Sequence, residues 1–255
     1  MKITQWVPAH ESPRWRVIQG WMDSRLSQNL PDGCNEIPLV RSLPIGDEKM
    51  REWNEVVETF LKSDSEWLWS THLDVVVDPG TLKRLLSWNK PFVSALVFMK
   101  QSPVIPHVWT DYDPERKFIN RIDDTYEWFM KHLDWIRGGA YLIEPKPEDA
   151  LIEVGFTSTS CTLVHRSVLE KMERPWFVQH GLNSGGEDFN FFEKARNAGF
   201  KGYVDRSCIC EHLNIDQGPS SLDFMMWYWN STYKNTGQPS ETSSSVTGSN
   251  GNPTG

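Results

Sequence analysis

The 255-residue sequence has few cysteines and no long apolar run. Four cysteines are too few for a disulfide scaffold, which favours a reduced, cytoplasmic setting, either of the cell or of an infected host. No stretch of about 18 apolar residues occurs, so no membrane span is expected. The N-terminal segment MKITQWVPAHESPRW also lacks the apolar region of a signal peptide.

Positive charge is also scarce. Lysine and arginine number 26 against 34 aspartates and glutamates, which gives a formal net charge of −8. This balance counts against a nucleic-acid partner, although a local basic groove on an acidic protein remains compatible with one. Tryptophan, by contrast, is abundant, with 13 residues. Indole rings suit a core and also suit stacking on sugars or bases.

Strand and helix patterns alternate through the first 235 residues, which predicts one α/β domain at 1–235. Apolar runs predict strands at Lys2–Val7, from Trp67, and at Phe92–Phe98, Gly155–Val164 and Gly202–Cys210. Helical spacing predicts helices at Glu48–Lys62, Pro79–Trp88, Ser167–Met172, 187–198 and Leu222–Tyr233, with an amphipathic piece at Tyr126–Ile136. A strand, a helix and a strand in succession indicate a parallel crossover. Residues 236–255 are rich in Ser, Gly and Thr, and a disordered tail is expected there.

The stretch WLWSTHLDVVVDPGTLKRLL reads as a buried strand, a polar corner and a helix. Such corners, at the C-terminal ends of strands, are where α/β sheets bind ligands. His72 and Asp74 are two residues apart in an extended segment, so their side chains point to the same side. An imidazole and a carboxylate suit Mn²⁺ or Mg²⁺, with phosphate oxygens completing the shell. The alternative is that Asp74 caps a turn and His72 lies on the surface.

A second candidate is Glu187-Asp188, which follows the glycine turn Ser184-Gly185-Gly186. A carboxylate presented from such a turn can act as a general base on a substrate hydroxyl. The glycine pair lets a ligand approach the backbone. Two acids at a helix N-terminus are also favoured by the helix dipole alone.

A third candidate is CICEH, at 208–212. A zinc site is one interpretation, but the spacing is tighter than that of the usual cysteine pairs. The cysteines fit better as small apolar strand residues, which leaves His212 available as a ligand.

Taken in order, these segments resemble the GT-A glycosyltransferases of the broad family-2-like group, which use nucleotide-sugar donors. Four stretches carry the resemblance: MREWNEVVETFL, EWLWSTHLDVVVDPGTLKRLL with FVSALVF, CTLVHRSVLEKMERPWF, and GGEDFNFFEKARNAGFKGYVDRSCICEH. The resemblance implies a Rossmann-like GT-A domain with a mostly parallel central sheet flanked by helices.

The resemblance also implies roles for individual residues. Asp74 matches the second Asp of the family's Asp-x-Asp motif, and His212 matches its C-terminal metal histidine. His72 stands where the first Asp would be, and is a third candidate ligand for Mn²⁺ or Mg²⁺. Asp188, with Glu187 beside it, matches the base of inverting members. The implied donor-binding residues are Val7, Pro8, His10, Glu11, Arg51, Asn54, His72 and Asp74, and the implied acceptor-binding residues are Trp176, Gly185 and Gly186.

The predicted function is therefore metal-dependent, inverting transfer of a sugar to an acceptor hydroxyl, with UDP as the nucleotide by family habit. A glycan or small-molecule acceptor is favoured, and a modified DNA base is a minority alternative. Two other classes stay open. One is a nucleotidyltransferase-like enzyme, for which Arg14 and Arg16 are the candidate phosphate contacts. The other is a non-catalytic nucleotide- or sugar-binding protein that has lost its metal site at His72.

Overall fold

The computed structural model describes residues 1–6, 9–10, 35–36, 42–43, 47–72, 74–77, 80–99, 106–109, 127–132, 147–179, 186–214 and 218–220. The predicted helix at Leu222–Tyr233, the predicted tail at 236–255 and the Asp78-Pro79 helix start lie outside these residues. No helix within the described part of the chain is long and apolar enough to cross a membrane.

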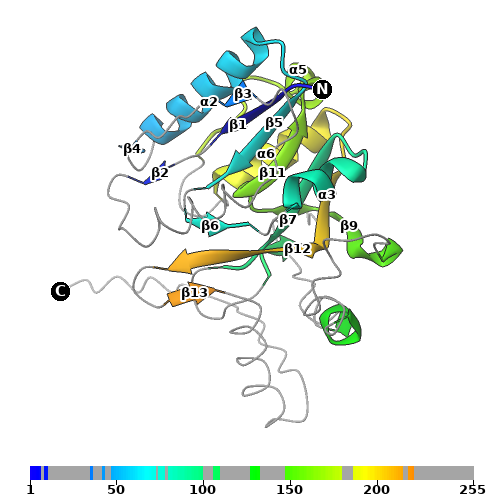
Figure 1. Cartoon of the computed structure of the whole chain (residues 1–255). Coiled ribbons are helices and arrows are strands. Elements are labelled where there is room, and N and C mark those ends of the chain that lie inside the picture. The colour runs from blue at the N-terminus through cyan, green and yellow to red at the C-terminus, as the bar shows by residue number, and fades with distance from the viewer. Residues whose placement is uncertain are drawn as a thin grey trace, which may run out of the picture.

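The strands and helices follow the predicted alternation (Figure 1). The strands are β1 (Ile3–Trp6), β2 (Ala9–His10), β3 (Asn35–Glu36), β4 (Ser42–Leu43), β5 (Trp67–Thr71), β6 (Val75–Val76), β7 (Phe92–Val97), β8 (Val108–Trp109), β9 (Leu151–Val154), β10 (Phe156–Thr157), β11 (Cys161–His165), β12 (Gly202–Asn214) and β13 (Gly218–Ser220). The helices are α2 (Asp47–Lys62), α3 (Thr81–Ser87), α5 (Arg166–Lys171) and α6 (Glu187–Asn197), with a 3₁₀ turn, η2, at Glu148–Ala150. Residues 127–132 are also helical.

A nine-stranded sheet with the order β13-β12-β7-β11-β5-β1-β3 forms the centre, and β6 and β9 pair with β12 off this path. Strands β1, β3, β5, β7 and β12 run in one direction, so the predicted parallel crossover from β5 to β7 is confirmed. Strand β11 lies between β5 and β7 and runs antiparallel to both. The prediction of a mostly parallel sheet therefore needs correction, because the sheet is mixed. The predicted strand at Gly155–Val164 is in fact two strands, β10 and β11, which belong to different sheets.

Apolar side chains alternate between the two faces of this sheet and form two core layers. On one face, Leu68, Leu96 and Val164 pack with helices α2, α5 and α6. On the other face, Trp69 and Leu163 pack with helix α3. The prediction of an α/β fold with a central sheet flanked by helices is therefore confirmed. The buried thiols of Cys161, Cys208 and Cys210 belong to the α3 layer, as expected of small apolar strand residues.

Gly202, at the start of β12, lies directly against the ring of Phe192 in α6. A Cβ atom added there would lie 2.7 Å from Cε1 of Phe192. We expect Gly202→Ala to lower the free energy of unfolding by about 1–3 kcal/mol, because two packed elements must separate. Gly186→Ala is the matched control, since its Cβ would meet nothing within 4 Å. Urea denaturation of both variants tests this, and equal stability of the two would contradict it.

Candidate functional site

Asp74 and His212 lie side by side at one edge of the sheet, although 138 positions apart in sequence. Asp74 follows β5, and its carbonyl accepts a hydrogen bond from the backbone N–H of Leu213 at 2.8 Å. Strand β6, which begins at the next residue, pairs with β12 and places Val75 opposite His212. This short antiparallel pairing brings the predicted carboxylate and imidazole together.

The Asp74–His212 pair has the chemistry of a divalent-cation site. The Nδ1 atom of His212 lies 2.9 Å from the carbonyl oxygen of Phe98. A carbonyl only accepts hydrogen bonds, so Nδ1 carries the proton and donates it. In the neutral ring, the Nε2 lone pair then faces Oδ2 of Asp74 at 3.6 Å. Two electron-rich atoms at this spacing call for a proton or a cation between them, and two bonds of about 2.1 Å can span it.

The remaining metal ligands would have to come from elsewhere. Within the described ranges, no three His, Cys, Asp or Glu side chains gather as a metal-binding group. Nevertheless, the residues present fit a cation, since Asp74 is only 3% exposed and a backbone carbonyl orients the imidazole of His212. Phosphate oxygens of a bound substrate are the ligands that the sequence argument expects to complete the shell.

His72 contacts a different part of the site. Its backbone N–H donates to the carbonyl of Ser160 at 2.8 Å, and its Nδ1 lies 3.3 Å from the Ser160 hydroxyl. Its ring also packs edge-on against Trp53, with ring centroids 5.5 Å apart. These contacts place His72 between the Asp74 corner and the β10–β11 loop, and its role as a metal ligand stays a prediction.

Asp188 lies at the first turn of α6, where the β10–β11 loop meets the helix. The backbone N–H of Thr159 donates to Oδ1 of Asp188 at 3.2 Å, and the Thr159 hydroxyl donates to the same oxygen. Among the described residues, nothing donates a hydrogen bond to Oδ2. One carboxylate oxygen is thus held in place, and the other is left to accept a proton.

The electrostatic surroundings of Asp188 suit a base that works near neutral pH. Burial, together with the charge of Glu187, raises the pKa of Asp188 to about 6, against the lowering effects of Thr159 and Lys49. Lys49 forms an ion pair with Glu187, and its ammonium lies 4.6 Å from the centroid of the Trp53 ring. Asp188 is therefore mostly ionised at pH 7, yet more basic than an ordinary aspartate.

These contacts form one continuous site at the sheet edge. Next to the Asp74–His212 pair, His72 contacts Ser160. The neighbour of Ser160, Thr159, donates a hydrogen bond to Asp188. In addition, the ring of Trp53 packs against His72 and lies under Lys49, which pairs with Glu187. The predicted metal ligands and the predicted base thus belong to the same edge.

Three other predicted site residues already have contacts within the fold. The amide of Asn54 donates to the carbonyls of Met50 and Phe177 and accepts from the Phe177 N–H, so it joins α2 to the segment after α5. Arg51 is exposed and lies 3.9 Å from Glu55. Trp176 is buried and donates to the Leu169 carbonyl at 2.8 Å. The contacts of Asn54 and Trp176 serve the packing of the fold, and that of Arg51 is an exposed pair within α2. The substrate roles of the three residues stay predictions.

The other predicted residues are placed only in part. Gly186 is the exposed N-cap of α6, directly before Glu187 and Asp188. His10 belongs to β2, which pairs with β4, but its side chain is not described. Val7, Pro8, Glu11 and Gly185 lie outside the described residues.

Three residues of this edge were not predicted from the sequence. Thr159 and Lys49 hold the two acids of α6, and His107 lies beside His212. The polar run TSTS before β11 could have indicated the role of Thr159. Four successive hydroxyl groups at the end of a sheet can donate hydrogen bonds to a neighbouring carboxylate. His107 packs edge-on against Phe156, and burial lowers its pKa to about 4, with the charge of His212 as the lesser cause. Its imidazole is therefore neutral at pH 7.

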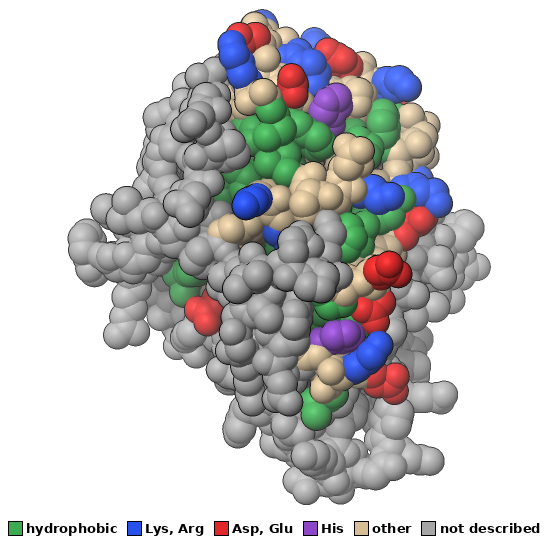
Figure 2. Space-filling model, turned by 45° about the vertical axis from the view of Figure 1, so that its right-hand side comes forward, with side chains coloured by type: hydrophobic (Ala, Val, Ile, Leu, Met, Phe, Trp, Pro, Cys, Tyr) green, Lys and Arg blue, Asp and Glu red, His purple; other side chains and the backbone are tan. Residues whose placement is uncertain are grey.

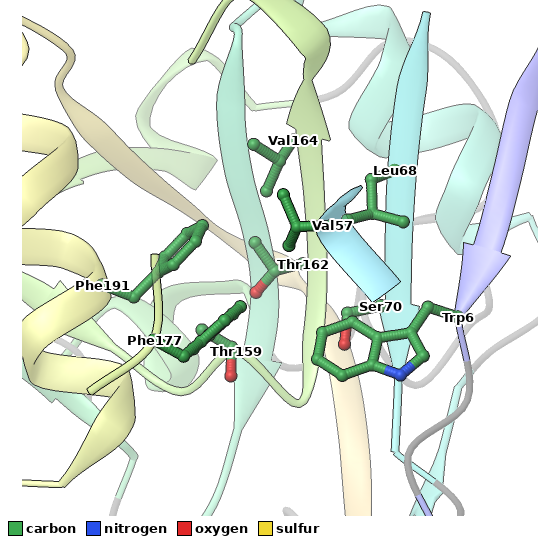
Figure 3. Close-up of a pocket in the computed structure, with 9 residues that line it drawn as sticks. All are labelled: Trp6, Val57, Leu68, Ser70, Thr159, Thr162, Val164, Phe177 and Phe191. Carbon is green, nitrogen blue, oxygen red and sulfur yellow. The ribbon is translucent and has the colours of Figure 1, made fainter. Parts of the chain in front are cut away.

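A narrow cavity lies beneath this edge, next to Thr159 (Figure 3). Its lining residues come from β1, α2, β5, β11, α6 and their connections, and are Trp6, Val57, Leu68, Ser70, Thr159, Thr162, Val164, Phe177 and Phe191. The space open to a water-sized sphere is about 10 Å³, which is roughly what one water molecule needs. Sugars and nucleotides need far more room, so a substrate would bind outside this cavity, over the strand ends.

Removing the Thr159 hydroxyl tests whether Asp188 acts as a base. The variant Thr159→Val keeps the side-chain shape but loses the hydrogen bond that favours the ionised carboxylate, so the pKa of Asp188 rises. The base works only when deprotonated, so the acid limb of the activity profile, expected near pH 6, should move to higher pH by roughly one unit. Thr157→Val, which removes the hydroxyl bonded to the His107 carbonyl, is the control and should leave the limb in place. An unmoved limb in Thr159→Val would contradict this role.

The comparisons with known proteins give a likeness of fold. No family model matches the sequence, and the search of curated proteins finds no match. Among solved structures, "A197 from STIV" has a TM-score of 0.53 at 16% identity, over 88% of this chain and 91% of that one. GalNAc-T7, solved with UDP, GalNAc and Mn²⁺, has a TM-score of 0.49 at 12% identity, over 83% of this chain and 43% of that one. The second score is too low to support an inference. At such low identity, the first shows that this chain shares the overall fold of A197.

Proposed function

We propose that this chain is a GT-A-type glycosyltransferase that moves a sugar from a nucleotide-sugar donor to an acceptor hydroxyl. The observation that carries the proposal is the meeting of a carboxylate–imidazole pair and a partly buried aspartate at one edge of the sheet. The pair is Asp74 with His212, and the aspartate is Asp188. In α/β sheets, ligands bind at such an edge, beyond the C-terminal ends of the strands.

In this proposal Asp74 and His212 hold Mn²⁺ or Mg²⁺. When bound, such a cation acts as a Lewis acid that stabilises the negative charge of the departing diphosphate. The buried carboxylate of Asp74 supplies negative charge. The Phe98 carbonyl fixes the ring of His212 so that Nε2 points toward the Asp74 carboxylate. His72 replaces a carboxylate of the related motif, so the site carries one negative charge fewer.

Asp188 is the proposed general base. Thr159 holds Oδ1, so Oδ2 is the atom that takes the proton of the acceptor hydroxyl as that oxygen attacks the anomeric carbon. A base on the face opposite the leaving group gives inversion of the anomeric configuration. Lys49 pairs with the neighbouring acid Glu187, and its positive charge offsets part of the rise in the pKa of Asp188 that burial and Glu187 cause.

A glycan or a small molecule is the favoured acceptor. On the face in Figure 2, Lys and Arg side chains lie interspersed with Asp and Glu over the described surface. A nucleic-acid acceptor calls for a basic face, and the net charge of −8 also counts against one. The proposal also includes a reduced, cytoplasmic setting for the chain, as the low number of cysteines suggests.

The direct test is to incubate the protein with a panel of sugar nucleotides and a panel of acceptors, and to measure the release of nucleoside diphosphate. We expect one donor to be consumed in the presence of Mn²⁺ or Mg²⁺, and NMR of the product should show the inverted anomeric centre. A retained configuration would rule out Asp188 as a single-step base. No release with any donor would favour a non-catalytic binding protein.

A further inference from the structure

Strand β12 carries a bulge directly before the segment that bears His212. Its pairing with β7 runs from Tyr203 to Asp205, opposite Val93 to Ala95, and resumes with Ile209 opposite Leu96. The residues at 206–208 have no counterpart in β7. At about 3.3 Å per residue, the same three residues in a regular strand would move His212 roughly 10 Å farther along the strand axis. The bulge therefore determines where His212 lies.

The carboxylate of Asp205 joins this bulge to helix α3. Asp205 is fully buried, and its Oδ1 accepts from the backbone N–H of Ser207 at 2.8 Å and from the Ser207 hydroxyl. Its Oδ2 accepts from Nε1 of Trp88 at 2.6 Å and from Nε of Arg84 at 3.3 Å. The guanidinium of Arg84 also donates to the Ser207 hydroxyl at 3.1 Å. One oxygen thus shapes the bulge, and the other fixes it to the helix.

We propose that Asp205 is a positioning residue for His212: it holds the bulge that brings the imidazole to Asp74 and to the Phe98 carbonyl. Beyond the bulge, β12 turns to pair with β6 through Glu211 and His212. Neither the sheet pairing nor the hydrogen bond to Phe98 forms at the present register without the extra residues. The effect on Mn²⁺ binding rests on the proposed metal-dependent function, whereas the positioning of His212 is a property of the fold.

Two variants of different severity test the proposal. Ser207→Ala removes the hydroxyl that links Asp205 to Arg84 within the bulge. Asp205→Asn keeps the size of the side chain but puts an NH₂ group in place of one carboxylate oxygen. That NH₂ group would then face N–H donors instead of accepting hydrogen bonds from them. We expect each variant to lower the affinity for Mn²⁺ alone by about tenfold or more, as for other residues that orient a metal ligand. Electron paramagnetic resonance of free Mn²⁺ measures this affinity.

Ser94→Ala is the matched control. Ser94 is as buried as Ser207, and its hydroxyl makes a 2.8 Å hydrogen bond to that of Thr162, in the β7–β11 pair. Ser94→Ala also removes one buried hydroxyl from the same sheet, but it leaves the bulge intact. The variant should therefore bind Mn²⁺ as tightly as the unmodified protein. Equal weakening of Ser94→Ala and Ser207→Ala would overturn the proposal.

A second measurement keeps the test independent of the metal. The Nδ1–H proton of His212, assigned by its absence in His212→Ala, should give a slowly exchanging NMR signal because it is bonded to Phe98. We expect the signal to shift or broaden in Ser207→Ala and Asp205→Asn, and to stay unchanged in Ser94→Ala. An unchanged signal in both bulge variants would overturn the positioning role. Absence of Mn²⁺ binding in the unmodified protein, with the signal shifted in those variants, would instead overturn only the metal-dependent function.

Discussion

Replacing Asp188 with asparagine is expected to lower the rate of sugar transfer by roughly 10²–10⁴-fold, the range that general base catalysis contributes. Asparagine keeps the size of the side chain, and its amide oxygen still accepts the hydrogen bonds from Thr159. The amide nitrogen, however, cannot take a proton from the acceptor hydroxyl. Donor affinity, measured by calorimetry, should stay within about twofold, because the change is felt mainly in the transition state.

Glu187→Gln is the control for this change. It removes one negative charge from the same turn of α6 and breaks the ion pair with Lys49, but leaves the proposed base in place. We expect a much smaller loss of turnover, within about tenfold, since general base catalysis is retained. If Asp188→Asn kept the original turnover, or if both variants lost it equally, Asp188 would not be the base. A loss of donor affinity as large as the loss of rate would indicate a binding role instead.

Replacing Arg84 with methionine is expected to lower the free energy of unfolding by about 3–5 kcal/mol, as breaking a buried ion pair usually does. The side chains of Arg84 and Asp205 are 7% and 0% exposed. Methionine fills much of the same volume but leaves the buried charge of Asp205 without its cationic partner. The midpoint and slope of urea denaturation give the change.

Arg51→Met provides the comparison on the surface. Its side chain is 66% exposed, and its guanidinium lies 3.9 Å from the Glu55 carboxylate. Exposed pairs of this kind contribute roughly 0–1 kcal/mol, so the loss of stability should be small. An Arg84→Met variant no less stable than Arg51→Met would show that the remaining hydrogen bonds of Asp205 suffice to hold its charge.

Much of the fold follows from local patterns in the sequence. The helical spacing at 48–62 and the glycines around 187–198 place α2 and α6 within one or two residues of their observed bounds. The apolar run at Phe92–Phe98 likewise predicts β7. The place of β11 between β5 and β7 could not be predicted in this way, because an antiparallel strand and a parallel one have the same apolar alternation.

The candidate site shows the same division. Single residues could be selected, since Asp74 follows a buried strand and Asp188 opens a helix after glycines. Their partners depend on long-range pairing: His212 meets Asp74 only through β6 and β12, and Thr159 meets Asp188 across a loop. Asn54 shows the opposite case, because a polar position on a helix face looks the same in sequence whether it binds a ligand or joins two segments of the chain.

The most direct measurement is a calorimetric titration with UDP, GDP and CDP, each with and without Mn²⁺, on the unmodified protein and on Asp74→Asn. We expect one nucleoside diphosphate to bind tightly, only with Mn²⁺, and the binding to be lost in Asp74→Asn. Binding that needs Mn²⁺ and Asp74 would support the donor site at this sheet edge. No binding of any of the three, with or without Mn²⁺, would contradict the proposal that this chain uses a nucleotide-sugar donor.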